Sequence, residues 1–199
     1  MGAFALPSRS IVRSTKPSVV ASTEKTVLCL QRTPFANLCR DIVFLRFAKD
    51  GLRFAAQALL SLQEACEAHI ISNLSQAARI VQHYKRGTVN ASDLKLVHTL
   101  DSEVEFIVDQ KDNNKLQHLP KANLMRLFRA AGVDRASSDL YDETERCIVT
   151  FLTAVLQNVT SVVMSRRTAS SKTVSPTVSA ADISYSLSTK VYGLAATKR

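Results

Sequence analysis

The sequence predicts an all-α fold in which two units of short, long and short helices pack against each other. The composition is the first observation, because the 199 residues include only 5 Gly, 5 Pro and no Trp, while 46% are hydrophobic. Such a low turn content disfavours an all-β fold. The other two observations are a pair of long amphipathic stretches and a short motif that recurs after each of them.

The first long stretch runs from Leu52 to Tyr84 and contains neither Gly nor Pro. Its apolar residues recur at three- and four-residue steps, which predicts one helix over the whole stretch. About thirty helical residues make a rod of roughly 45 Å, too long to bury its apolar face alone. The rod therefore needs a partner of similar length. The stripe consists of Ala55, Leu59, Leu62, Cys66, Ile70, Leu74, Ala77, Val81 and Tyr84.

The second long stretch, from about Ser138 to Arg167, supplies that partner. Asp139 and Asp142 lie near its predicted N-terminus, and Arg166 and Arg167 lie at its C-terminus, which suits the helix dipole. Its apolar stripe comprises Leu140, Cys147, Phe151, Ala154 or Val155, Leu156, Val159, Val162 and Val163.

Shorter helices are expected around both rods. A helix begins with Thr33 as N-cap and Pro34 at its first position, and the turn at 49–51 ends it. An earlier helical segment is expected from near Glu24 to Arg32, and a short strand at 104–108. The remaining short helices are expected at about 92–100, 121–131 and 180–188.

A repeated motif marks the start of the third helix in each unit. The first copy is Thr88-Val89-Asn90-Ala91-Ser92-Asp93-Leu94, and the second is Thr177-Val178-Ser179-Ala180-Ala181-Asp182-Ile183. Each copy follows a long helix, so the pattern T-V-x-A-x-D indicates an internal duplication.

These features resemble the histone fold. The first half is similar to histone H-three in Pro34-Phe35, Arg40-Asp41-Ile42, Leu52-Arg53-Phe54, Leu62-Gln63-Glu64-Ala65, Glu67-Ala68 and Lys85-Arg86-x-Thr88. The second half is similar to histone H-four in Gly132-Val133, Arg135, Tyr141-x-Glu143-Thr144, Phe151-Leu152, Thr177-Val178, Ala180-x-Asp182, Tyr185-x-Leu187 and Tyr192-Gly193. The whole chain resembles the fused histone doublets of large DNA viruses such as the marseilleviruses. The resemblance implies that the two rods cross antiparallel in an intramolecular handshake.

The resemblance also sets the expected domain boundaries. They are a flexible basic N-terminal arm at 1–26, an H-three-like fold at 27–100, an acidic linker at 101–119, an H-four-like fold at 120–193 and a basic tail at 194–199. The arm, rich in Arg and Ser and poor in acids, also fits an organelle transit peptide. The implied location is the virion, host nucleus or viral factory, or otherwise nuclear chromatin.

The net charge of +9 suits a polyanionic partner. The resemblance makes that partner double-stranded DNA, with Arg53 and Arg135 entering the minor groove and Arg86 and Thr88 contacting the backbone. The charge is low for a histone pair, so looser wrapping is expected. The implied DNA-binding residues are Arg32, Arg40, Arg53, Lys85, Arg86, Thr88, Lys121, Arg126, Arg129, Arg135, Arg166 and Arg167.

Other residues are implied in pairing and assembly. Asp93 is expected to pair with Arg86, whereas the partner of Asp182 stays open between Arg166, Arg167 and Lys172, because the loop there is longer than in the family. His83 is implied at a four-helix bundle with a second copy, formed by about Ala78 to Leu96. Tyr192 is implied in docking an H-two-B/H-two-A-like doublet that would complete an octamer.

Several function classes lack support in the sequence. No Gly-rich phosphate loop, paired-carboxylate cleft or nucleophile–base motif indicates an enzyme, and no cofactor is implied. The four cysteines and four histidines lack metal-site spacing, and no run of eighteen apolar residues predicts a membrane span. The main alternative to DNA packaging is a histone-fold scaffold that binds other proteins, as some transcription factors do.

Overall fold

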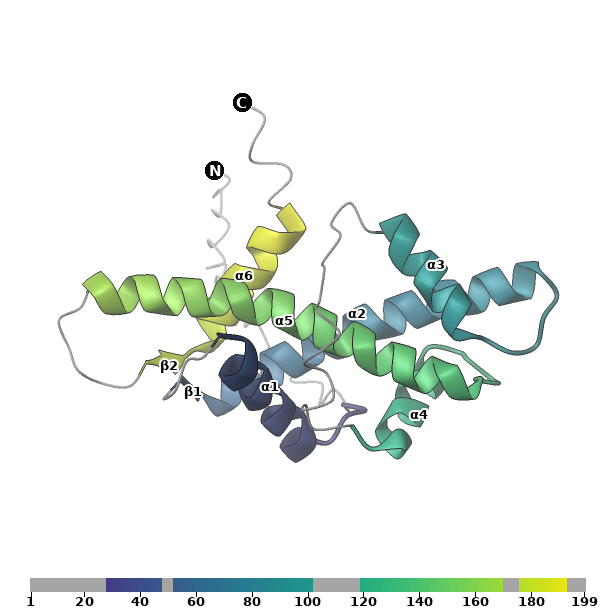
Figure 1. The fold of residues 1–199 in the computed structure, drawn as a ribbon, viewed down its shortest axis with the longest axis horizontal. Coiled ribbons are helices and arrows are strands. Elements are labelled where there is room, and N and C mark those ends of the chain that lie inside the picture. Colours follow the sequence, from purple (N-terminus) through teal and green to yellow (C-terminus); the bar gives the residue numbers. More distant parts are fainter. Residues whose placement is uncertain (1–27, 48–51, 102–118, 170–175, 193–199) are drawn as a thin grey trace, which may run out of the picture.

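The computed structural model describes residues 28–47, 52–101, 119–169 and 176–192, and it confirms the all-α prediction (Figure 1). Two short–long–short helix units follow one another. The elements are α1 (Arg32–Phe47), β1 (Arg53–Phe54), α2 (Ala56–His83), α3 (Ala91–Asp101), α4 (Lys121–Ala130), α5 (Ser138–Ala169), β2 (Thr177–Val178) and α6 (Ala180–Tyr192). The predicted strand at 104–108, the arm at 1–26 and the tail at 194–199 lie outside the described residues.

The two long helices, α2 and α5, cross and run in opposite directions, with α1 and α4 on one side of them and α3 and α6 on the other (Figure 1). Short helices pack across the units: α1 contacts α5, α4 contacts α2, α3 contacts α5 and α6 contacts α2. One continuous core therefore joins both units. Each long helix is therefore packed partly by the short helices of the other unit, which is the arrangement that the handshake prediction requires.

The buried stripe of α2 agrees with the predicted one over most of its length, since Leu62, Cys66, Ile70, Leu74 and Val81 are all buried. Its two ends were predicted wrongly. Leu52 to Ala55 are not helical, because Arg53 and Phe54 instead pair in parallel with Thr177 and Val178. At the other end, Tyr84 follows the helix and is 65% exposed.

The second long helix follows its prediction more closely. It begins at Ser138, as expected, and continues to Ala169. Leu140, Cys147, Val159 and Val163 are buried, whereas Phe151 is only half-buried and its ring stacks on His69 of α2 with the centroids 4.7 Å apart. Among the described helices, α5 alone has the length and hydropathy of a membrane span. However, 56% of its most apolar 18-residue segment is buried inside the fold.

The repeated motif has one physical basis in both units. Its valine, Val89 or Val178, is buried and pairs with the loop before the other unit's long helix. Its aspartate is the third helical residue and accepts the N-cap N–H, from Asn90 to Asp93 at 2.9 Å and from Ser179 to Asp182 at 2.8 Å. This is one of the two hydrogen bonds of a capping box, so the motif fixes both the loop pairing and the start of the helix.

The segment before α1 corrects two predictions. Residues 28–31 are not helical, and α1 begins at Arg32, two residues before Pro34. Pro34 is tolerated there because N–H groups in the first turn of a helix have no partner within the helix. The segment is instead held by the buried side chains of α2, since Glu67 accepts the N–H groups of Cys29 at 2.7 Å and Leu30 at 2.9 Å.

All four cysteines are free thiols, and Cys39, Cys66 and Cys147 are buried, as their apolar neighbours in sequence indicated. Burial raises the pKa of Cys147 to about 12. Its Sγ lies 2.8 Å from His98 Nε2, which joins α5 to α3. Among the described residues, no group of three His, Cys, Asp or Glu side chains is arranged to hold a metal ion.

Candidate nucleic-acid interface

Exposed basic side chains lie at both ends of the crossed helices and along the α1 and α4 side between them. We call the two ends after the arginine that precedes each long helix. The Arg135 end consists of residues 85–93 and 134–139, and the Arg53 end consists of residues 52–57, Arg166 and residues 176–182. The centre consists of the exposed faces of α1 and α4.

The Arg135 end is built on a parallel bridge between Val89 and Ala136. Val89 N–H donates to Arg135 O at 2.9 Å, and Ser137 N–H donates to Val89 O at 3.0 Å. These bonds place Arg135 of one unit beside Thr88 of the other. Both Arg135 and Arg86 are exposed, so two guanidinium groups from different units face solvent at one loop pair.

Arg86 is held in place from two sides. Its Nη2 donates to Asp93 Oδ1 at 2.5 Å, which is the pair that the resemblance implied. Its guanidinium carbon also lies 5.9 Å from the centre of the Tyr84 ring. Asp93 is almost fully buried while Arg86 is 40% exposed, so the carboxylate orients the arginine without withdrawing it from solvent.

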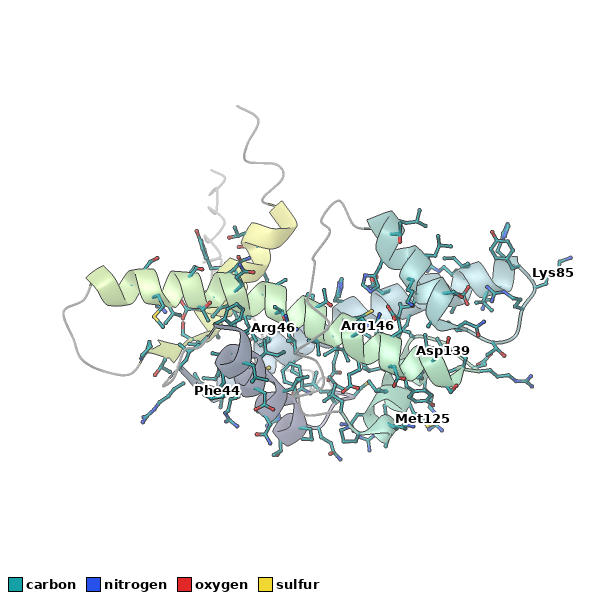
Figure 2. The ribbon with its side chains drawn as sticks, in the orientation of Figure 1. Phe44, Arg46, Lys85, Met125, Asp139 and Arg146 are labelled. Carbon is teal, nitrogen blue, oxygen red and sulfur yellow. The ribbon has the colours of Figure 1, made fainter. Side chains whose placement is uncertain are left out.

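Lys85 has an unusual backbone conformation for a lysine. It follows the C-cap of α2 with a φ of 55°, whereas Gly132 has the equivalent conformation after α4 with a φ of 77°. Glycine is the usual residue there, because a side chain costs roughly 1–2 kcal/mol in the left-handed region. Lys85 projects from the tip of this end (Figure 2). The strained position therefore presents a cation to solvent.

The Arg53 end has the same construction. Arg53 N–H donates to Pro176 O and Ala55 N–H to Val178 O, both at 3.0 Å. The partner of Asp182 is Arg166, whose Nη2 donates to Asp182 Oδ2 at 2.7 Å. The interaction left open among three basic residues is therefore made by the earliest of them, and α5 is long enough to bring Arg166 beside the start of α6.

The surroundings of Asp182 at the Arg53 end stabilise its ionised form. Burial raises the pKa of its carboxyl, but hydrogen bonds from the Ser179 N–H, the Ser179 hydroxyl and Arg166 outweigh that effect and leave the pKa lowered. The carboxylate is therefore ionised at neutral pH and keeps Arg166 in place.

The centre carries the remaining predicted arginines and Lys121, all of them exposed. Arg40 Nη1 donates to Asn37 Oδ1 at 3.0 Å on α1, and the Lys121 ammonium lies 5.9 Å from the Tyr141 ring centre. Arg126 of α4 is close enough to Cys29 to lower its pKa, although burial and Glu67 raise that pKa overall. The segment that precedes α1 therefore lies near α4. The exposed basic residues here are Arg32, Arg40, Lys121, Arg126 and Arg129.

Three of the predicted residues, Arg167, Tyr192 and His83, make no described contact with the basic loops. The side chains of Arg167 and Tyr192 lie outside those that the structure describes. His83 is exposed beside Tyr84, with the two ring centroids 5.5 Å apart in an edge-to-face arrangement. It is the last residue of α2, two positions before Lys85 of the Arg135 end.

Sequence reasoning missed two acidic residues at the Arg135 end. Asp134 is exposed directly before Arg135, and Asp139 lies in the first turn of α5, where it accepts a hydrogen bond from the Ser137 hydroxyl. The predictions placed Asp139 only as a favourable helix-dipole residue. The signal available was the run Ser137-Ser138-Asp139, which is typical of a helix start that supplies its own capping groups.

Comparison with known proteins agrees with this architecture. Residues 16–100 match the family model of the core histone domain, which covers histones H-two-A, H-two-B, H-three and H-four. The structure is similar to the crystal structure of the histone from Methanopyrus kandleri, with a TM-score of 0.60, 14% sequence identity, and coverage of 80% of this chain and 93% of that chain. The chain has the histone fold. Because 80% of the chain exceeds either unit, the structural similarity extends over both units of the histone fold.

Proposed function

We propose that this chain is a core histone doublet that binds and wraps double-stranded DNA without sequence specificity. The observation that carries the proposal is the paired construction of the two ends. Each end combines an exposed arginine three residues before a long helix, Arg53 or Arg135, with an arginine clamped by aspartate, Arg166 or Arg86. A histone fold with such basic loops suggests DNA binding.

The chemistry is that of backbone recognition. Guanidinium groups bind phosphates bidentately and release condensed counterions, so affinity should fall steeply with salt. Such contacts position the duplex but do not read its bases. Arginines that enter the minor groove read its width and the ease with which the duplex bends. With a net charge of only +9, wrapping should be looser than for a more basic histone pair.

The doublet assignment rests on the two units. We infer that the first is H-three-like and the second H-four-like, as in the doublets of large DNA viruses, where the product would package the viral genome in the virion, host nucleus or viral factory. Fusion makes the handshake intramolecular, so pairing depends on the connecting segment and not on protein concentration.

Higher assembly would use surfaces that the handshake leaves exposed. Tyr84, Leu96 and Leu100 are large apolar residues exposed around the C-terminal end of α2 and on α3, with His83 beside them. We propose that a second copy covers them in a four-helix bundle. Tyr185 on α6 is 60% exposed, and we propose that α6, with Tyr192, docks an H-two-B/H-two-A-like doublet to complete an octamer.

A protein-binding scaffold is the competing function, and the same exposed apolar residues favour it. A scaffold has no need of arginines at both loop pairs, one of them beside a lysine held in a left-handed conformation. Loss of those arginines therefore discriminates between the two functions, because it should weaken DNA binding while leaving protein docking intact.

The test is nuclease protection and equilibrium binding with duplexes of unrelated sequence. Wild-type protein should protect DNA regardless of sequence, and Arg53→Ala with Arg135→Ala should weaken binding by about tenfold or more at moderate salt while lowering the salt slope by about two. Arg146→Ala is the matched control, since Arg146 is exposed on α5, eight residues after the start of that helix, and pairs with Glu143 of the same helix. Absence of binding by the wild type, or equal losses from the control, would overturn the proposal.

A further inference from the structure

The two ends of the basic surface can be compared position by position. Arg53 and Arg135 each stand three residues before the first residue of a long helix, Ala56 and Ser138 respectively. The residue before the arginine is Leu52 at one end and Asp134 at the other. The second residue of the long helix is Gln57 at one end and Asp139 at the other, and all of these except half-buried Leu52 are exposed. The Arg135 end therefore carries two carboxylates at positions where the Arg53 end carries none.

Asp139 is exposed, but its carboxylate also makes a contact within the Arg135 end. The Ser137 hydroxyl donates to its carboxylate, and the pKa of Asp139 is lowered first by that bond and then by the backbone N–H groups of Asp139, Ala91 and Leu140. Ala91 begins α3 of the other unit. The carboxylate thus lies at the start of α5 and near the start of α3, where unpaired N–H groups attract an anion.

No corresponding group is present at the start of α2. Its N-cap, Ala55, makes no side-chain capping hydrogen bond, and its first turn contains no acidic residue. The only carboxylate described at that end, Asp182, is already paired with Arg166. The Arg135 end, by contrast, carries three described cations and three described carboxylates, and Figure 2 shows Lys85 and Asp139 at the same end of the molecule. They are Lys85, Arg86, Arg135, Asp93, Asp134 and Asp139.

We propose that the two ends bind duplex DNA unequally, with Asp134 and Asp139 acting as a built-in competitor for phosphate that weakens the Arg135 end. The inference rests on the proposed function, since it concerns how one DNA-binding surface distributes its affinity. Carboxylates repel an approaching phosphate and satisfy the cations and N–H groups that it would use. The duplex is therefore held firmly at the Arg53 end and the centre, and it detaches first at the Arg135 end.

The equivalent positions allow a reciprocal exchange as the test. Asp139→Gln gives the start of α5 the residue found in α2, and Gln57→Asp gives α2 the residue found in α5. Affinity for a short duplex of mixed sequence should rise about two- to fivefold with Asp139→Gln and fall by a similar factor with Gln57→Asp. Asp134→Asn should also raise affinity. Glu64→Gln, which removes an exposed carboxylate in the middle of α2, should change it less than either.

A second measurement locates the effect. In the wild-type background Arg53→Ala should cost more affinity than Arg135→Ala, and in the Asp134→Asn, Asp139→Gln background the two costs should become equal. Thermal unfolding of each variant reports any loss of the Asp139 contacts, and Asp134→Asn and Gln57→Asp leave those contacts in place. If the wild type fails to bind DNA, the proposed function fails. If the wild type binds DNA but the exchanges change neither its affinity nor the losses caused by Arg53→Ala and Arg135→Ala, the proposal of unequal ends fails while the proposed function stands.

Discussion

Replacing Glu67 with alanine should release the segment that precedes α1. Glu67 is 5% exposed and accepts three hydrogen bonds, from the N–H groups of Cys29 and Leu30 and from Gln63 Nε2. Gln63 also donates to Leu30 O at 2.9 Å. The two side chains, one turn apart on α2, thus hold both the N–H and C=O groups of a segment more than thirty residues earlier in the chain.

The magnitude follows from the groups left without partners. A buried N–H that loses its acceptor costs about 1–3 kcal/mol. Leu30 is buried and should cost near the upper value, whereas Cys29 is half-buried and water can reach it, so its cost should be near the lower value. The free energy of unfolding should therefore fall by about 3–4 kcal/mol in Glu67→Ala. Glu67→Gln keeps one acceptor oxygen and should lose only about 1–2 kcal/mol.

The assay is equilibrium unfolding in urea, followed by circular dichroism. Glu64→Gln is the control, because Glu64 lies one turn earlier on the same helix and is exposed, so its replacement should change stability by less than about 0.5 kcal/mol. Hydrogen exchange should show faster exchange at Cys29 and Leu30 in the alanine variant. A loss below about 1 kcal/mol in Glu67→Ala, or one equal to that of the control, would refute the account of this contact.

Three further predictions concern the basic ends and the assembly surface. Lys85→Gly should raise the free energy of unfolding by about 0.5–1 kcal/mol, since glycine adopts the left-handed conformation without strain. The same substitution removes a cation and should weaken DNA binding. A thermal melt and a DNA titration on the same samples test both effects, and lower stability of the variant would contradict the strain argument. Asp182→Ala should cost about 2–3 kcal/mol at neutral pH, because the carboxylate holds Ser179 and Arg166. Because the pKa of Asp182 is lowered by folding, its contribution is fully present above the ordinary Asp pKa of about 4 and disappears as pH falls through the lowered value, so wild type and variant should converge in acid melts. Leu96→Glu should reduce self-association measured by sedimentation without unfolding the chain, whereas Phe44→Glu, at an even more exposed apolar residue on α1, should not; equal effects would count against the proposed bundle.

The helical architecture could be predicted because periodicity and repetition are local properties of the sequence. The apolar stripe of α2 and the T-V-x-A-x-D motif each required only neighbouring residues to recognise. The pairing of Asp93 with Arg86, by contrast, was expected from the resemblance to the histone fold, and the structure contains it.

The errors fell where distant parts of the chain decide the local structure. Arg53 and Phe54 were expected to be helical, but Thr177 and Val178 offer them backbone partners that no local pattern reveals. The expected helix before Arg32 is replaced at 28–31 by a segment that hydrogen-bonds to Glu67. The choice of Arg166 for Asp182 likewise depends on how far α5 continues. Asp139 was predicted only as a helix-dipole residue, and its hydrogen bond with Ser137 was not predicted.

The crossing of α2 with α5 has a consequence for biosynthesis. The first long helix ends at His83, but its apolar partner is complete only about eighty residues later. At about 5–20 residues per second, the ribosome needs roughly 4–16 s to supply it. During that interval the apolar face of α2 in the nascent first unit lacks its native packing partner. Ribosomes on one messenger RNA bring many such apolar faces close together. A chaperone that shields them would then matter most before translation ends, not after release.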